Sequence, residues 1–155
     1  MHPFFQDYHQ RLTDLHQDIL NAIEGMPPEA LDWTPIQETT GDMNSINVLV
    51  THLCGAERYW IGEVACGDIS GRVRAEEFQV SGMEAGNLAA KINGATQYAK
   101  SALENLAIDN LAKDGTTPSE SRVFTVGWAL LHALEHTAVH LGHIQITRQL
   151  WDEKN

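Results

Sequence analysis

Cysteine, basic side chains and long apolar runs are all scarce in this chain. Its 155 residues include 2 cysteines, Cys54 and Cys66, which are too few for a disulfide scaffold. The start, MHPFFQDYHQ, has neither the basic segment nor the continuous apolar segment of a secretory leader. No apolar run approaches the roughly 18 residues that a membrane-spanning helix needs. These absences predict a cytoplasmic protein with no membrane partner.

Positive charge is also in short supply. Lysine and arginine together number 10 against 21 aspartates and glutamates, which gives a formal net charge of −11. A surface of this sign repels phosphate backbones, so the composition argues against nucleic acid as a partner. Neither a glycine-rich phosphate loop nor a Gly-x-Ser-x-Gly nucleophile motif is present.

Apolar residues recur at three- and four-residue spacing along most of the chain, and no segment of useful length alternates as a β-strand does. The pattern predicts one domain, residues 1–155, folded as an all-α four-helix bundle. The expected helices run from about Pro3 to Glu24, from Asn44 or Ser45 to near Gly67, from just after Ser81 to about Leu106, and from Thr125 to about Trp151.

Local signals mark the ends of these helices and the connections between them. Ser81 and Glu84 form a capping-box pattern before the third helix, and the segment PEALDW in the first connection predicts one extra helical turn. The connections, at about 15 to 20 residues, exceed those of a simple up-and-down bundle. They indicate crossovers or functional loops and leave the helix directions open.

Histidine is the residue that the chain has in excess, with 8 in total. His2, His9 and His16 recur every seven residues beside the apolar stripe of the first helix. Successive members of this row lie about 10 Å apart along a helix, too far to share a metal ion. We therefore expect a solvated row without a function.

The last helix carries a different histidine pattern. In LLHALEHTAVHLGHIQ, His132, His136 and His140 follow one another at four-residue steps, and His143 comes three residues later. Side chains one helical turn apart can direct two imidazole nitrogens to one metal ion. His52, among apolar neighbours of the second helix, is the candidate third ligand, because a buried imidazole needs a partner. Spacing alone does not choose between the possible pairs in the last helix.

The sequence lacks the motifs of several other known classes of metal site. The segment HTAVH lacks the glutamate of the His-Glu-x-x-His metalloprotease helix, and no Glu-x-x-His pair of a di-iron bundle is present. Two cysteines are too few for a thiolate-rich zinc site.

The segments NSINVLVTHLCGAERYW and LLHALEHTAVHLGHIQITRQLW resemble the DinB-like, or YfiT-like, family of bacterial metalloenzymes, and the order of elements is similar over nearly the whole chain. The resemblance implies a four-helix bundle that holds a divalent ion, zinc or nickel, through His52, His136 and His140. It also implies a homodimer, a small-molecule substrate and, for some members, a low-molecular-weight thiol as co-substrate.

The chain departs from the family pattern after the last ligand, where Leu141, Gly142 and His143 replace a common Arg-Gly-Gln. His143 could take over the hydrogen-bonding or acid/base role of that glutamine. His132 could support the site or replace His140 as a ligand. Glu57 and Glu135 are close to the proposed ligands in sequence and could act as a general base or as hydrogen-bond partners of the ligands, but we expect them to be solvated surface carboxylates.

Three imidazoles leave a coordination position open, which is typical of a catalytic site. The first hypothesis is therefore a metal-dependent transferase or hydrolase that activates a thiol or water. The alternative is a non-catalytic, stress-related module that binds metal or dimerises.

Overall fold

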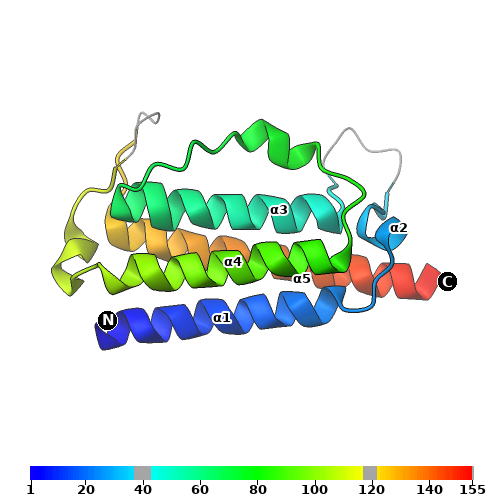
Figure 1. The fold of residues 1–155 in the computed structure, drawn as a ribbon, viewed down its shortest axis with the longest axis horizontal. Coiled ribbons are helices and arrows are strands. Elements are labelled where there is room, and N and C mark those ends of the chain that lie inside the picture. The colour runs from blue at the N-terminus through cyan, green and yellow to red at the C-terminus, as the bar shows by residue number, and fades with distance from the viewer. Residues whose placement is uncertain (37–42, 117–121, 155) are drawn as a thin grey trace.

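Four long helices form the bundle in the computed structural model, which describes residues 1–36, 43–116 and 122–154. These helices are α1 (Pro3–Ile23), α3 (Ile46–Glu57), α4 (Ala85–Glu104) and α5 (Val126–Lys154) (Figure 1). A single turn, α2 (Pro28–Leu31), follows α1, as PEALDW predicts. Within the described ranges the only β-structure is one isolated bridge, so the predicted all-α bundle is confirmed. Parts of the first and last predicted connections, residues 37–42 and 117–121, lie outside these ranges.

Polar side chains begin two of these helices as expected. Ser45 Oγ accepts a hydrogen bond from the Val48 backbone N–H at 3.3 Å, which selects Ser45 over Asn44 as the cap of α3. Thr125 Oγ1 accepts from the Trp128 N–H at 3.2 Å at the start of α5. Each bond satisfies an N–H group that has no partner inside its helix.

The capping box predicted at Ser81 is wrong. Helix α4 begins at Ala85, and Glu84 occupies the cap position without a side-chain cap bond. Gly82 adopts a positive φ of 69°, and its N–H donates to Asp32 Oδ2 at 2.7 Å. The bond between Gly82 and Asp32 holds this turn against the first connection. Ser81 therefore lies outside the helix and does not cap it.

Helix α3 continues as a π-helix, η1 (Arg58–Ala65), and ends at Cys66. Gly67 follows with a positive φ of 70°, which agrees with the predicted end of the second helix. Widened helical turns of this kind are frequent at functional sites.

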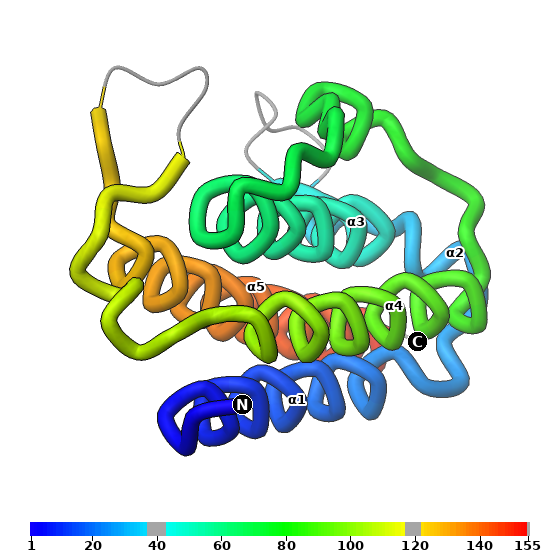
Figure 2. Tube along the Cα trace, turned by 60° about the vertical axis from the view of Figure 1, so that its left-hand side comes forward, coloured from blue at the N-terminus to red at the C-terminus, as the bar shows by residue number. Residues whose placement is uncertain are grey.

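The helices do not simply alternate in direction. Figure 1 shows α1 and α5 running one way and α3 and α4 running the other, and α1 and α3 each pack against both α4 and α5. Because α3 and α4 run in the same direction, residues 66–84 return along the length of the bundle (Figure 2). We call this segment the crossover; it contains a short 3₁₀ helix, η2 (Arg74–Phe78), which packs on α3.

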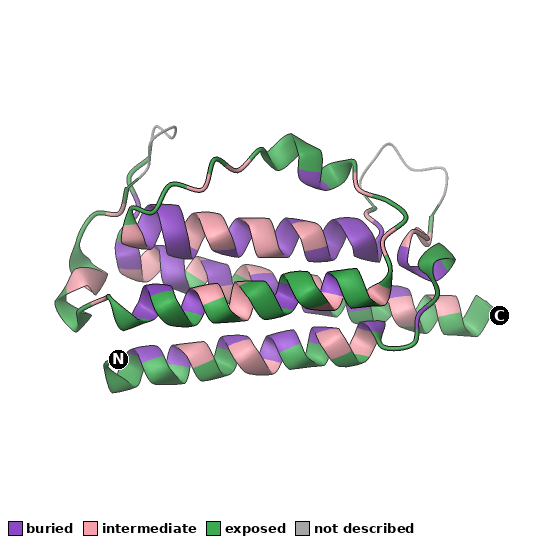
Figure 3. Ribbon diagram, viewed as in Figure 1, coloured by how far each residue is buried: buried purple, intermediate pink, exposed green. Residues whose placement is uncertain are grey.

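The buried side chains form two apolar clusters along the bundle. Figure 3 shows the buried positions distributed over all four long helices. Helices α1, α4 and α5 contribute to both clusters, whereas α3 contributes to one cluster and its continuation η1 to the other. Each long helix also carries one polar residue that takes part in a shared hydrogen-bond network. These residues, which we call the polar layer, are His16, Glu57, Thr96 and Thr137.

Hydrogen bonds join the polar layer across all four helices. His16 bonds Thr96 Oγ1 through Nδ1 at 2.6 Å and Glu57 Oε1 through Nε2 at 2.9 Å. Thr137 Oγ1 donates to the same Glu57 oxygen at 2.6 Å. Buried polar groups are tolerated when they satisfy one another in this way.

Two sequence-based expectations are therefore wrong. His16 is 1% exposed and Glu57 is 2% exposed, although we expected a solvated histidine and a solvated carboxylate. Seven residues fall about 20° short of two helical turns, so the histidine row drifts around α1. Its first member, His2, is exposed and caps α1, whereas His16 lies among the buried side chains.

We predict that His16→Ala lowers the free energy of unfolding by about 3 kcal/mol, because it leaves Glu57 buried without its imidazole partner. His9→Ala is the control on the same helix, since His9 is only partly buried and makes one bond, to the Thr96 carbonyl. Denaturant unfolding followed by tryptophan fluorescence measures both changes. Equal losses in the two variants would contradict the polar layer's role.

Candidate metal centre

Three histidine side chains from two helices converge beside the crossover. His52 projects from α3, and His136 and His140 project from the facing side of α5. The Nε2 atom of His136 lies 3.2 Å from that of His52 and 3.1 Å from that of His140. The structure thus brings together the three residues that the sequence nominates, with candidate ligand atoms all within 4.8 Å of one another.

This spacing fits a divalent metal ion. Nitrogens that bind a tetrahedral ion at about 2.0–2.1 Å lie roughly 3.3 Å apart. The lone pairs of two imidazole nitrogens at this separation repel each other unless a proton or a cation lies between them. A single cation bound by all three nitrogens would remove the repulsion within the whole cluster. Neutral imidazoles favour zinc, nickel or copper over magnesium or calcium, so the donor set agrees with the expected zinc or nickel.

The crossover supplies a carboxylate that orients His52. His52 Nδ1 lies 2.8 Å from Glu77 Oε2, and Arg72 bonds both oxygens of Glu77, at 2.5 and 2.8 Å. Because a carboxylate accepts, Nδ1 carries the proton and Nε2 keeps its lone pair for the cluster. Carboxylate partners of this kind fix the tautomer of metal-binding histidines.

Gly55 makes this arrangement possible. A Cβ at this position would collide with the Glu77 carboxylate, which packs directly over the α3 backbone. Only glycine permits this approach at residue 55. Sequence reasoning missed Glu77, since it lies in a polar segment without helical periodicity.

The electrostatics of the site favour the protonation states that metal binding requires. Burial, reinforced by the neighbouring imidazoles, lowers the pKa of His136 to about 3 and that of His140 to about 4. Burial also lowers the pKa of His52, against the opposing effect of Glu77. Burial tends to raise the pKa of Glu77, but its bonds to Arg72 and His52 bring it below the usual value. At neutral pH the imidazoles are uncharged and Glu77 is ionised.

The two remaining histidines of α5 lie beside the cluster. His132 stacks on Trp128 with ring centroids 4.8 Å apart, so the geometry pairs His136 with His140. His143 Nδ1 is 3.4 Å from His140 Nδ1, on the far side of that ring from the cluster. His143 Nδ1 is therefore placed to accept a hydrogen bond from His140 Nδ1.

The acidic residues near the ligands in sequence have separate positions. Glu135 is exposed, as expected, and its carboxylate lies 3.9 Å from His132. Glu57 belongs to the polar layer in the bundle interior.

His52 and His136 line a cavity of about 480 Å³. Aromatic and charged side chains form its walls, including Tyr59, Trp60, Arg72, Arg74 and His132. Its volume is in the range typical of small-molecule sites. Neither cysteine lines this cavity, and burial raises the pKa of both thiols, that of Cys66 to about 11. This agrees with the expectation that neither cysteine is a nucleophile.

Comparison with known proteins adds a family and a fold. A family model described as Mycothiol-S-transferase matches residues 7–153, whereas no curated protein matches the chain significantly. A conserved protein from Enterococcus faecalis has a similar structure, with a TM-score of 0.71 at 15% identity over 94% of this chain and 95% of its own.

Two further solved structures share the fold. A Streptococcus pneumoniae protein has a TM-score of 0.62 at 10% identity, covering 96% of this chain and 90% of its own. An uncharacterized protein from Clostridium difficile 630 has the same score and identity, covering 96% and 95%. No helix in the described part of the chain is long and apolar enough to cross a membrane.

We predict that Glu77→Gln weakens metal binding by about 10- to 100-fold, since it removes the carboxylate that orients His52. Glu76→Gln is the matched control, because Glu76 is exposed on the same 3₁₀ helix. Competition with a chromogenic chelator measures zinc and nickel affinity in both variants. Equal affinities would show that Glu77 does not support the cluster.

Proposed function

Because the chain belongs to the family described as Mycothiol-S-transferase, we propose that it is a metal-dependent enzyme that transfers a low-molecular-weight thiol to a small electrophile. Family membership confirms the DinB-like resemblance and implies a thiol co-substrate. The observation that carries the metal dependence is the convergence of three imidazole Nε2 atoms beside a cavity of about 480 Å³.

We assign the divalent ion, zinc or nickel, to His52, His136 and His140. When bound, it supplies a Lewis acid that favours the thiolate form of a thiol at neutral pH. The protein's own contribution is to hold these rings neutral and correctly oriented. Glu77 keeps the proton of His52 on Nδ1, and His143 Nδ1 is placed to accept a hydrogen bond from His140 Nδ1.

The cavity walls suit a substrate with both flat and polar parts. Trp60 and His132 meet edge to face at 4.8 Å and offer apolar surface to the electrophile. Arg72 is neutralised by Glu77, while Arg74 lies over the Phe78 ring at 4.9 Å and keeps its hydrogen-bond donors for polar groups of either substrate. These residues would align thiol and electrophile for transfer.

This cavity favours catalysis over the alternative of a non-catalytic module. A closed structural zinc site has four protein ligands, whereas three histidines beside a cavity leave a position for substrate.

We predict that His52→Ala, His136→Ala and His140→Ala each weaken zinc and nickel binding by at least about 100-fold and abolish transfer. His9→Ala, on α1, keeps both properties. Metal content is measured by plasma mass spectrometry, and transfer is measured with mycothiol and a chromogenic electrophile, with glutathione for comparison. Full metal content in all three variants would overturn the ligand assignment; unchanged transfer after complete metal removal would overturn the metal-dependent mechanism.

We also infer a homodimer through the outer side of α5. Leu131, Val139, Ile146 and Leu150 are 63%, 51%, 55% and 44% exposed there, and their spacing places them along one side of the helix. An exposed apolar stripe of this length is typical of an interaction surface.

We predict that Val139→Lys converts the dimer to a monomer, because it places a charge in the apolar stripe. Gln97→Lys, an exposed position on α4, is the control with the same added charge. Light scattering coupled to size-exclusion chromatography reports the mass. A monomeric wild-type chain at micromolar concentration would rule out this dimer.

A further inference from the structure

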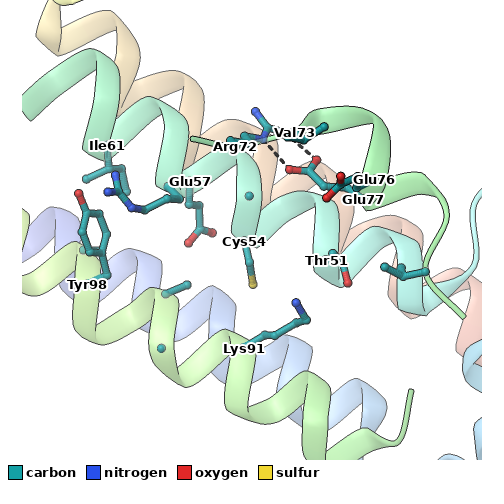
Figure 4. Close-up of a pocket in the computed structure, with 16 residues that line it drawn as sticks. Thr51, Cys54, Glu57, Ile61, Arg72, Val73, Glu76, Glu77, Lys91 and Tyr98 are labelled. Atoms are coloured by element: carbon teal, nitrogen blue, oxygen red, sulfur yellow. Dashed lines mark hydrogen bonds and ion pairs between the residues drawn. The ribbon is translucent and has the colours of Figure 1, made fainter. Parts of the chain in front are cut away.

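A second cavity lies on the other side of the crossover from the histidine cluster. It has a volume of about 550 Å³ and is enclosed by α3, α4 and the crossover (Figure 4). Aliphatic side chains form much of its wall, including Ile61, Val80, Ala95 and Ala99. This volume and lining resemble those of small-molecule sites, and the proposed thiol transfer makes no use of the cavity.

A buried carboxylate oxygen points into this cavity. Glu57 is 2% exposed and lines the cavity, and Figure 4 shows its carboxylate directed into the space between α3 and α4. Its Oε1 atom bonds His16 and Thr137, whereas its Oε2 atom is buried and bonds no described residue. Buried acceptors in native proteins have partners, so this oxygen marks a position where a ligand can donate.

The hydrogen bonds of the polar layer determine whether Glu57 Oε2 is available as a hydrogen-bond acceptor. Thr96 Oγ1 lies within hydrogen-bond distance of the Ile92 carbonyl, at 2.9 Å, and of His16 Nδ1, at 2.6 Å. His16 Nε2 and Thr137 Oγ1 both bond Glu57 Oε1. The polar layer therefore uses only one carboxylate oxygen, and Oε2 is left as an acceptor.

The other charges around the cavity are largely compensated. Arg58 bonds the Asp68 carboxylate at 2.9 Å, and Arg72 bonds Glu77. Lys91 and Glu76 have opposite charges and are exposed at the rim. Among the lining groups that the structure describes, Glu57 Oε2 is the buried oxygen without a hydrogen-bond partner, and the apolar walls around it disfavour a charged ligand.

We propose that the cavity between α3, α4 and the crossover is a second ligand site for a small neutral molecule with an aliphatic body and one hydrogen-bond donor, a hydroxyl or an amide N–H. The donor bonds Glu57 Oε2, and the body packs against Ile61, Ala95 and Ala99. Arg72 and Glu77 border this cavity as well as supporting the proposed metal centre, but the proposed ligand bonds neither of them.

Four probes of similar size test the proposal on the full 155-residue chain. They are 1-hexanol and hexanamide, which carry a neutral donor, 2-heptanone, which has no donor, and hexylammonium, which is charged. Amide NMR titration locates binding, and the side-chain carboxyl ¹³C resonance of Glu57 reports contact with the donor.

We expect saturable binding of the alcohol and the amide, with shifts at Ala95, Tyr98 and the Glu57 carboxyl. The ketone and the ammonium ion bind at least tenfold more weakly, a difference of about 1.4 kcal/mol. Equal binding of the ketone, tighter binding of the ammonium ion, shifts confined to the histidine cavity, or no saturable binding would overturn the proposal.

A cavity-filling variant provides a second test. Ala95→Leu places a larger side chain in the cavity and is expected to weaken 1-hexanol binding at least tenfold. Ala89→Leu, the control on α4, lies at a different surface hollow and keeps wild-type affinity. Unchanged affinity in a folded Ala95→Leu protein would contradict the site.

Discussion

Two consecutive long helices that run in the same direction oblige the chain to travel the length of the bundle between them. In this protein α3 and α4 impose that return, and the crossover that makes it supplies Arg72 and Glu77. It covers α3 on the side where His52 emerges and forms a wall of both cavities. Gly55 allows the Glu77 carboxylate to reach His52 across the helix backbone. The orientation of His52 therefore depends on the topology as well as on the helices themselves.

The polar layer supports the same region from inside the bundle. Glu57 is one residue of α3, and Thr137 is adjacent to His136 on α5, so the bonds between them help to fix the pair of helices that carries the histidine cluster. Apolar clusters lie on either side of this layer, and the low local dielectric that they create strengthens its hydrogen bonds. A buried hydrogen-bond network at mid-bundle thus complements the histidine cluster, which lies between α3, α5 and the crossover.

Sequence periodicity was sufficient for the fold class and for nominating His52 together with a pair of histidines in the last helix, whereas the choice of His136 and His140 came from the family resemblance. Four-residue spacing within one helix and an apolar setting in another are local signals, and the structure brings those three rings together. Glu77 had no such signal, because its role depends on where the crossover passes over α3. The helix directions likewise depend on long-range packing that no local pattern encodes.

Two misjudged residues did carry a usable signal. His16 is four residues after Leu12 and three before Ile19, and Glu57 is four after Leu53 and four before Ile61, so both lie on apolar faces. The prediction gave more weight to the polar nature of these side chains than to their position on an apolar face, because a charged residue is rarely buried unless it is paired. The pairing itself joins two helices that are 41 residues apart in sequence, which a reading of either helix alone does not reveal.

The central claim is that His52, His136 and His140 together hold one divalent ion. X-ray absorption spectroscopy of the zinc- or nickel-loaded protein tests it most directly, because imidazole rings have a distinct outer-shell scattering pattern. The account predicts three imidazole ligands in the wild-type protein, with zinc–nitrogen distances of about 2.0–2.1 Å, and two in each single His→Ala variant that retains metal. Fewer than three imidazoles in the wild type, or a sulfur ligand at about 2.3 Å, would contradict it.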